Sequence, residues 1–271
     1  MRVETALPDF ASEYPISGEQ AAQFQRDGFI ILKGVLSPDE VTSFGAAIRA
    51  DAYRAFERDG AEPVFGGALI QKLNFRFESD AMSRYALSRR VGSIGARLSL
   101  SPAVRIYHEQ LLFKPPSGAP SYWHQDQYFW PLKTEQSIGT WLPLSDVTAE
   151  QGALRYVRCS HRLGDLGQFS IDEQSEAYFN RLAGENHLEV VQIGHMSAGD
   201  MCVHNGWTVH GAAPNRTNAM REAIVVTMYP DGTCIDTLHN DYRKSDRVDF
   251  LGGKPVGAIA DSELNTVIFA E

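Results

Sequence analysis

A histidine and an aspartate lie two residues apart, at His124 and Asp126, in the segment SYWHQDQYFW that runs from Ser121 to Trp130. In a β-strand, residues i and i+2 project from the same face, so these two side chains can direct a nitrogen and an oxygen at one point. Such a pair supplies two ligands for a metal ion, and a third ligand must come from elsewhere in the chain. The pair by itself is equally compatible with a strand that carries incidental polar residues.

Two later histidines could supply the third ligand. His204 and His210 both lie in the segment 199–217, which reads as a turn, a strand and a glycine-containing loop. Two histidines and one carboxylate on one face of a metal are typical of non-haem Fe(II) oxygenases, because this arrangement leaves three coordination positions for a co-substrate and O2. Residue types and spacing alone leave the choice between His204 and His210 open.

An arginine opens one of the most apolar runs of the chain. Arg221 begins the segment Arg221–Tyr229 (REAIVVTMY), whose middle is typical of a buried strand. Burying a guanidinium group alone is costly in free energy, so such an arginine needs an anionic partner. A dicarboxylate ligand would provide one, since the planar fork of Arg binds a carboxylate through two parallel hydrogen bonds. An internal ion pair or an exposed strand end is the alternative interpretation.

The part of the chain that precedes these residues, 1–100, reads as helix-rich. Ser17 and Gln20 have the spacing of a capping box, and Pro38 follows the cap residue Ser37 at the first helical position. Apolar runs between the cap signals complete the pattern. We therefore expect a buried strand and three helices: a helix from Ser17 to about Arg26, the strand from Phe29 to Val35, a helix from Ser37 to about Asp59 and a helix from Ala81 to Leu98.

From Val104 onward, the chain is dominated by short β-rich runs. Turn residues separate seven such runs, which we expect to form strands: Val104–Phe113, Ser121–Trp130, Gly139–Pro143, Leu154–Val157, Leu188–Ile193, Met201–His204 and Arg221–Tyr229. Strands at this spacing favour a β-sandwich or barrel over a parallel sheet, and a helix from Ile171 to Ala183 interrupts them. We expect one α+β domain, 1–271, with a mainly β core at 104–230 and a C-terminal lid or tail at 231–271.

The composition argues against several classes of partner. The 271 residues include 25 Lys and Arg against 34 Asp and Glu, and the net charge of -9 has the wrong sign for binding a nucleic-acid backbone. The segment Met1–Phe10 has no basic start that leads into an apolar run, and no apolar run has the length of a membrane span. The 3 cysteines include no Cys-x-x-Cys pair, which favours reduced thiols. We expect a cytoplasmic protein with neither nucleic acid nor a membrane as its partner.

Six short motifs, taken in order, resemble the phytanoyl-CoA dioxygenase family of Fe(II)/2-oxoglutarate-dependent oxygenases. They are Lys114-Pro115-Pro116, His124-Gln125-Asp126, the segment WLPLSDVTAEQGAL from Trp141 to Leu154, His210-Gly211, Pro214-Asn215 and Arg221. The resemblance extends from about Gly28 to Tyr229. It implies a double-stranded β-helix, the jelly-roll and cupin-like fold, with N-terminal helices packed on one sheet, and this agrees with the β-rich second half of the sequence.

The same resemblance implies roles for individual residues. His124, Asp126 and His210 would bind Fe(II), in preference to His204, and Arg221 would hold the distal carboxylate of 2-oxoglutarate. Four further residues would contact the co-substrate: Lys72, Gln110, Gln125 and Trp141. Gln125 conflicts with strict alternation along a strand, which turns it away from the metal. Related halogenases carry a small residue in place of the carboxylate ligand, so the presence of Asp126 disfavours halogenation.

The implied enzyme is a dioxygenase that uses Fe(II), 2-oxoglutarate and O2 and releases succinate and CO2. We expect it to hydroxylate, or otherwise oxidise by C–H abstraction, a small and largely apolar natural product or metabolite. Six aromatic residues near the ligands either line the substrate pocket or belong to the core: Tyr122, Trp123, Tyr128, Phe129, Trp130 and Trp207. The alternative is a cupin-type metal protein without oxygenase activity, such as an isomerase or a small-molecule-binding module.

Overall fold

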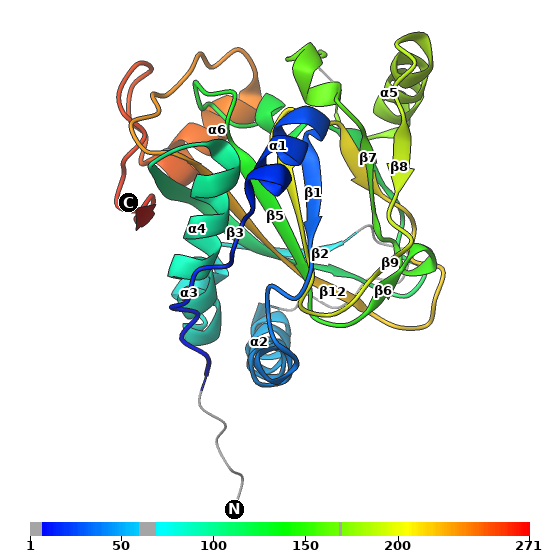
Figure 1. The fold of residues 1–271 in the computed structure, drawn as a ribbon, viewed down its shortest axis with the longest axis vertical. Helices are drawn as coiled ribbons and strands as arrows, with labels where there is room; N and C mark the ends of the chain where they lie inside the picture. The colour runs from blue at the N-terminus through cyan, green and yellow to red at the C-terminus, as the bar shows by residue number, and fades with distance from the viewer. Residues whose placement is uncertain (1–6, 60–68, 168–169) are drawn as a thin grey trace, which may run out of the picture.

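Two facing antiparallel sheets form the centre of the molecule (Figure 1). The computed structural model describes residues 7–59, 69–167 and 170–271. Within these ranges, the larger sheet has the order β1 (Phe29–Leu32), β10 (Met201–Asn205), β5 (Ile138–Pro143), β12 (Arg221–Pro230), β3 (Ala103–Lys114) and β13 (Val267–Ala270), and β2 (Ile70–Leu73) also pairs with β3. The smaller sheet has the order β4 (Ser121–His124), β11 (His210–Ala212), β7 (Leu154–Val157) and β8 (Val190–Gln192), while β6 (Val147–Thr148) and β9 (His195–Met196) form a separate pair. The expected α+β fold with a jelly-roll core is confirmed.

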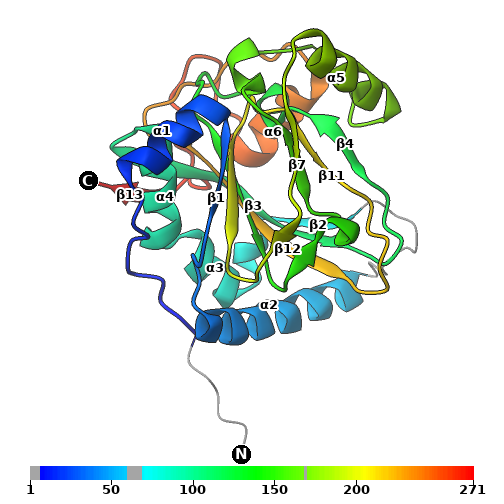
Figure 2. The same cartoon turned by 45° about the vertical axis from the view of Figure 1, so that its right-hand side comes forward.

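The helices of the N-terminal part pack on the outer face of the larger sheet. They are α1 (Gly18–Asp27), α2 (Pro38–Asp59), α3 (Asp80–Ala86) and α4 (Arg89–Ser99). Phe44 of α2 and Ile94 of α4 share one buried cluster with Ile224 and Val226 of β12. Figure 2 shows α2 running beneath the sheets. The expectation that these helices cover one sheet is confirmed.

Local sequence determines where these helices begin and end. Ser17 and Gln20 form the expected capping box, and Gly28 ends α1 in the left-handed region at φ 83°. The single helix expected from Ala81 to Leu98 is wrong, because the chain forms two helices there. Ser88 has extended backbone, and its side chain caps α4 by accepting a hydrogen bond from the amide of Val91 at 3.2 Å.

The interior between the two sheets is shared by side chains from both. Trp141 and Val225 of the larger sheet belong to one buried cluster with Leu154 and Tyr156 of the smaller sheet. Helix α5 (Glu173–Glu185) covers the outer face of the smaller sheet, where its Phe179 packs in a second cluster. Each sheet thus has one face covered by helices and one face toward the interior. Polar side chains from both sheets can meet in that interior.

The C-terminal segment 231–271 adds to the core. Helix α6 (Asp241–Leu251), which the sequence did not predict, buries Leu251 against Tyr107 and Tyr229. Strand β13 extends the edge of the larger sheet by pairing with β3. Among the described helices, none has both the length and the apolar character that crossing a membrane requires.

Candidate active site

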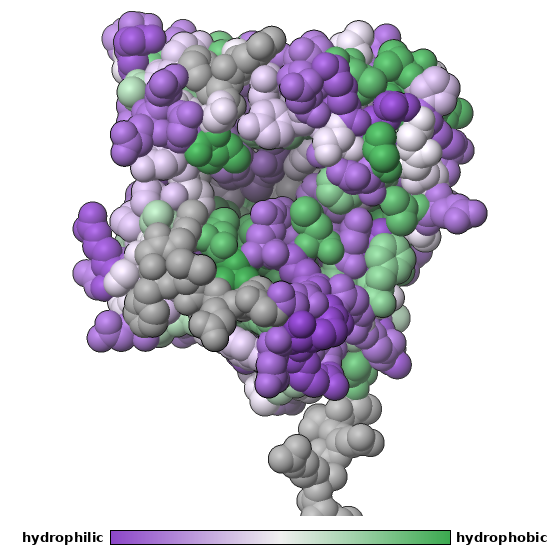
Figure 3. All heavy atoms as spheres, turned by 180° about the vertical axis from the view of Figure 1, so that it is seen from behind, coloured by the Kyte–Doolittle hydropathy of each residue, from purple (hydrophilic) through white to green (hydrophobic). Residues whose placement is uncertain are grey.

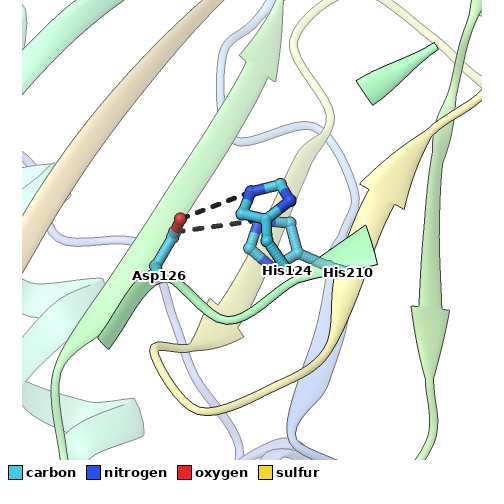
Figure 4. A group of neighbouring side chains, drawn as sticks. All are labelled: His124, Asp126 and His210. Atoms are coloured by element: carbon cyan, nitrogen blue, oxygen red, sulfur yellow. Dashed lines mark ion pairs between the residues drawn. The ribbon is translucent and has the colours of Figure 1, made fainter. Parts of the chain in front are cut away.

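His124 and His210 lie opposite each other on neighbouring strands of the smaller sheet. The register of β4 and β11 pairs their Cα atoms, and the ring centroids are 4.2 Å apart. The nitrogen and oxygen atoms that His124, His210 and Asp126 could offer to a metal all lie within 4.8 Å of one another. Figure 4 shows both rings facing the Asp126 carboxylate. The three side chains therefore form a compact group of candidate ligands.

Asp126 reaches this position from outside the strand. The strand expected from Ser121 to Trp130 is wrong beyond His124, because β4 ends there and Asp126 begins a short 3-10 helix, Asp126–Tyr128. Gln125 between them keeps extended backbone at φ -115° and ψ 122°. The bend brings the carboxylate beside the strand end, so His124 and Asp126 converge without the regular alternation that suggested their pairing.

Backbone carbonyls select the histidine tautomer that suits metal binding. Nδ1 of His124 lies 2.7 Å from the carbonyl oxygen of Tyr122, and Nδ1 of His210 lies 3.0 Å from that of Thr208. Because a carbonyl only accepts hydrogen bonds, each Nδ1 carries the proton and each Nε2 keeps its lone pair. The Nε2 atoms of His124 and His210 lie 3.5 and 3.7 Å from carboxylate oxygens of Asp126.

The electrostatics of the group also suit a cation. Burial, reinforced by the neighbouring His210, lowers the pKa of His124 to about 4, and burial together with His204 lowers the pKa of His210 to about 4. Burial opposes ionisation of Asp126, but the three surrounding histidines hold its pKa well below the usual range. Two neutral imidazoles and one carboxylate are a donor set that fits Fe(II).

His204 approaches the same carboxylate from the opposite sheet. It lies on β10, its Nε2 is 3.2 Å from Oδ2 of Asp126, and its ring centroid is 4.1 Å from that of His210. His204 is thus a neighbour of the three-residue group and not one of its members. The geometry favours His210 as the third ligand, in agreement with the family resemblance.

A cavity of about 430 Å³ opens beside the three side chains. Both sheets line it, and apolar side chains such as Leu112, Leu154 and Val225 make up much of the wall. The molecule is hollowed near the centre of the face shown in Figure 3. The candidate ligands at one part of this wall share the cavity with Arg221 and Trp141.

Arg221 is buried at this cavity, and the part of the chain that the structure describes offers it no anionic partner. It is only 2% exposed, and its Nη1 donates to the carbonyl oxygen of Gly152 at 3.1 Å. Its Nε has no hydrogen-bond partner among the described residues. No carboxylate among the described residues pairs with it, and it lies 5.3 Å from the ring centroid of Trp141. Burial lowers the pKa of Arg221 to about 10, which leaves it charged at neutral pH. An isolated buried guanidinium of this kind fits a carboxylate that enters with a ligand.

Two of the four other expected co-substrate contacts lie at the cavity, and two do not. Gln110 and Trp141 line it. Lys72 instead forms ion pairs with Asp59 and Glu78 at 2.5 and 3.1 Å. Successive side chains of a strand point to opposite faces, so the neighbour of Lys72 on β2, and not Lys72 itself, faces the cavity.

Gln125 is likewise turned away from the cavity. Its amide Nε2 donates to the carbonyl oxygens of Gly164 and Trp207 at 2.8 and 2.6 Å, and its Oε1 accepts from the amide of Leu166 at 3.0 Å. Through these hydrogen bonds, the Gln125 side chain holds the loop after β4 in place. Gln125 therefore points away from the candidate metal ligands, as strand alternation predicted, and not toward the co-substrate, as the family resemblance implied.

The sequence did not single out Gln71, which lines the cavity and hydrogen-bonds to Gln110 through its side-chain amide. Recognising the strand β2 would have placed Gln71 and Lys72 on opposite faces. Of the six aromatic residues left undecided, Tyr122 lines the cavity, whereas Trp130 belongs to a buried cluster with Tyr107 and Tyr229.

Comparison with known proteins identifies the family. The sequence model of the family described as "Phytanoyl-CoA dioxygenase (PhyH)" matches residues 24–223. The chain belongs to the phytanoyl-CoA dioxygenase family. As a member of that family, it is a 2-oxoglutarate-dependent, non-haem iron dioxygenase, and this decides between the two functions expected from the sequence.

Curated relatives of this family member carry related activities. The chain is 23% identical over 226 residues to a probable α-ketoglutarate-dependent hypophosphite dioxygenase from Stutzerimonas stutzeri, covering 77% of each protein. It is 30% identical over 164 residues to the ectoine dioxygenase of Sphingopyxis alaskensis, covering 57% of this chain and 53% of that enzyme. Both names describe dioxygenases, but they differ in substrate.

Solved structures share the fold of this family member. The epimerase SnoN, in complex with Fe3+, α-ketoglutarate and nogalamycin RO, aligns with a TM-score of 0.75 and 25% identity over 92% of this chain and 96% of SnoN. EctD from S. alaskensis, with 2-oxoglutarate and 5-hydroxyectoine, aligns with a TM-score of 0.66 and 23% identity over 84% and 83% of the two chains. The double-stranded β-helix expected from the sequence is thereby confirmed.

Proposed function

We propose that this dioxygenase hydroxylates a small, uncharged and largely apolar metabolite in the cavity between its sheets. His124, Asp126 and His210 would hold Fe(II), and Arg221 would bind the distal carboxylate of 2-oxoglutarate. The isolated guanidinium of Arg221 is the observation that carries this proposal. It is buried on the wall of the cavity that also exposes the three candidate ligands, and a dicarboxylate would supply its missing anion.

The chain's own residues have defined tasks in this proposal. The Nε2 atoms of His124 and His210 are already deprotonated and directed inward, so iron would displace no proton from either ring. Arg221 would fix one end of the co-substrate, with the Trp141 ring beside the guanidinium. The apolar wall would exclude water from the site.

Iron and 2-oxoglutarate together would supply the oxidising chemistry. The balanced reaction converts R–H, O2 and 2-oxoglutarate into R–OH, succinate and CO2, so one oxygen atom enters the product and the other enters succinate. The protein contributes the binding, the orientation and the polarity of the surroundings.

The charges in the wall restrict the substrate. Among the described residues that line the cavity, Asp126 and Arg221 are the formally charged ones, and the metal and the co-substrate would neutralise both. Apart from the histidines and Trp141, the remaining polar side chains carry no formal charge, namely Gln71, Gln110, Ser121 and Tyr122. An anion such as hypophosphite would need a second cation in this wall. We therefore infer a neutral substrate that offers a few hydrogen-bonding groups on an apolar frame.

An anaerobic titration with Fe(II) and 2-oxoglutarate tests the assignment. Wild type should develop the visible charge-transfer band of an iron-chelated 2-oxo acid, and Asp126→Ala and His210→Ala should each abolish it. Arg221→Leu should retain Fe(II) binding but require more 2-oxoglutarate. A wild-type protein without the band, or variants that keep it undiminished, would refute the site. Product mass then distinguishes hydroxylation, which adds one oxygen atom, from loss of hydrogen alone.

A further inference from the structure

His204 is placed to act on the site without belonging to the candidate ligand set. It lies on β10 of the larger sheet, opposite the strands that carry His124 and His210, and it is only 4% exposed. Its Nε2 lies 3.2 Å from Oδ2 of Asp126, within hydrogen-bond distance. A buried imidazole thus directs one nitrogen at a carboxylate that would bind the metal.

The backbone of the neighbouring strand leaves room for this ring. A Cβ atom on Gly139 of β5, the residue paired with His204, would lie 2.6 Å from its Nε2. That separation is too short for real atoms, so a side chain at this position would force the ring away from Asp126. Glycine at position 139 therefore permits the contact between His204 and Asp126.

The other nitrogen of His204 faces a hydroxyl group. The hydroxyl oxygen of Tyr156 lies 3.4 Å from Nδ1 of His204, and the Tyr156 ring stacks on Phe29 with centroids 4.4 Å apart. Tyr156 can donate its proton to Nδ1, and His204 can then carry its own proton on Nε2. A carboxylate only accepts hydrogen bonds, so this tautomer is the one that a neutral His204 needs beside Asp126.

We infer that His204 is a positioning residue, which donates from Nε2 to Oδ2 of Asp126 and leaves Oδ1 as the oxygen that would bind iron. His204 is closer to Oδ2 than His210 is, at 3.2 against 3.7 Å, whereas His124 faces Oδ1 at 3.5 Å. This inference rests on the proposed assignment of His124, Asp126 and His210 as ligands. Tyr156 is not a candidate ligand, and its hydroxyl group can orient the His204 ring. The relay runs from the Tyr156 hydroxyl through the imidazole to the carboxylate.

Holding Asp126 to one oxygen matters for the number of open positions at iron. Two histidine nitrogens and one carboxylate oxygen leave three positions for the two co-substrate atoms and O2, whereas a carboxylate that binds through both oxygens would take one of them. A hydrogen bond to the second oxygen opposes that rearrangement. Partners that orient a metal ligand in this way commonly change metal affinity by about 10- to 100-fold.

The first test measures the proton on His204 in the metal-free, wild-type protein. Histidine side chains labelled with 15N report by NMR which ring nitrogen carries hydrogen. We expect His204 to carry it on Nε2 and His124 and His210 to carry it on Nδ1. A neutral His204 protonated on Nδ1 would overturn the inference, because it could not donate to Asp126.

The second test compares Fe(II) affinity under anaerobic conditions for wild type, His204→Leu, His204→Gln and Tyr156→Phe. His204→Leu should weaken binding by roughly 10- to 100-fold. His204→Gln should restore most of the loss, because the glutamine Nε2 can occupy the place of the histidine Nε2 and donate in the same direction. Tyr156→Phe should give a smaller loss, since it removes only the group that orients His204.

The exposed residue His195 provides the matched control, and His195→Leu should bind Fe(II) as wild type does. Far-UV circular dichroism of each metal-free variant separates unfolding from a local effect. Unchanged Fe(II) affinity in His204→Leu would refute the inference. It would also be refuted if His204→Gln bound Fe(II) as weakly as His204→Leu, because that result would indicate that His204 is itself a metal ligand. If wild type binds no Fe(II), the proposed function fails instead.

Discussion

His124 and His210 are paired across β4 and β11, so the distance between the two strands determines the distance between the two rings. The register of the two strands is irregular just after this pair, between His210 and Ala212. Gly211 follows His210, and a Cβ atom on it would lie 2.7 Å from the carbonyl oxygen of Ser121 on β4. The absence of a side chain at position 211 therefore allows the two candidate ligands to face one cavity.

Replacing Gly211 by alanine should separate β4 from β11. We expect Gly211→Ala to lower the free energy of unfolding by about 1–3 kcal/mol, the usual cost of overpacking, and to weaken Fe(II) binding as His124 moves from His210. Chemical denaturation and anaerobic metal titration measure the two effects. Gly194→Ala is the control, because nothing lies within 4 Å of the added Cβ there. Equal Fe(II) affinity in both variants would contradict the argument.

Arg221→Leu should have opposite effects on stability and on co-substrate binding. Removing a buried cation that pairs with no described carboxylate should leave the metal-free protein at least as stable as wild type in thermal melts. Losing a charged hydrogen-bonding partner should cost about 1.5–3 kcal/mol of 2-oxoglutarate binding, or roughly 10- to 100-fold in its dissociation constant. Arg221→Lys should recover only part of this affinity because it lacks the planar fork. A destabilised Arg221→Leu protein that binds 2-oxoglutarate normally would show that the arginine is structural.

Lys72→Met should leave the affinity for 2-oxoglutarate unchanged. The sequence resemblance implied a contact from Lys72, but its ammonium group is engaged by Asp59 and Glu78 away from the cavity. Loss of these partly exposed ion pairs should cost at most about 1 kcal/mol of stability. Titration of 2-oxoglutarate in the presence of Fe(II) measures the affinity, with Arg221→Leu as the positive control. A tenfold or larger loss in Lys72→Met would restore the original expectation.

Lys114 should make stability depend on pH in the alkaline range. Its fully buried ammonium donates to the carbonyl oxygens of Ala119 and Ala213 at 2.8 and 3.0 Å, and no described carboxylate pairs with it. Burial, with smaller contributions from Arg221 and Arg155, lowers the pKa of Lys114 to about 7 from its ordinary value of 10.5. Between these two values the unfolded chain binds the proton and the folded protein does not, so the free energy of unfolding should rise with pH across this window.

Comparing wild type with Lys114→Met isolates this effect. The methionine variant keeps the apolar length of the side chain and has no proton to lose, so its free energy of unfolding should change less between pH 7 and pH 9 than that of wild type. Urea denaturation at the two pH values gives the slopes. Identical slopes for the two proteins would show that Lys114 stays protonated in the folded state.

Much of the architecture could be predicted because its signals are local. The capping box at Ser17 and Gln20 and the glycine at position 28 specify the ends of α1 within a few residues of chain. The apolar run after Arg221 specifies a buried strand, and β12 is buried along nearly its whole length. The prediction of one long helix from Ala81 to Leu98 was wrong, because the side chain of Ser88 caps a new helix and divides the expected helix into two.

The sequence by itself determined the chemistry that this protein can carry: two or three histidines, a carboxylate and an arginine at the start of an apolar strand. Tertiary structure decided which of them meet. Asp126 joins His124 because the chain bends after β4, and His204 reaches Asp126 because β10 lies across the interior. Lys72 is turned away by the alternation of β2, a strand defined only through its pairing with β3. The contact of His204 with Asp126 and the pairing of β2 with β3 join residues that are far apart in the chain, so no local pattern of residues specifies them.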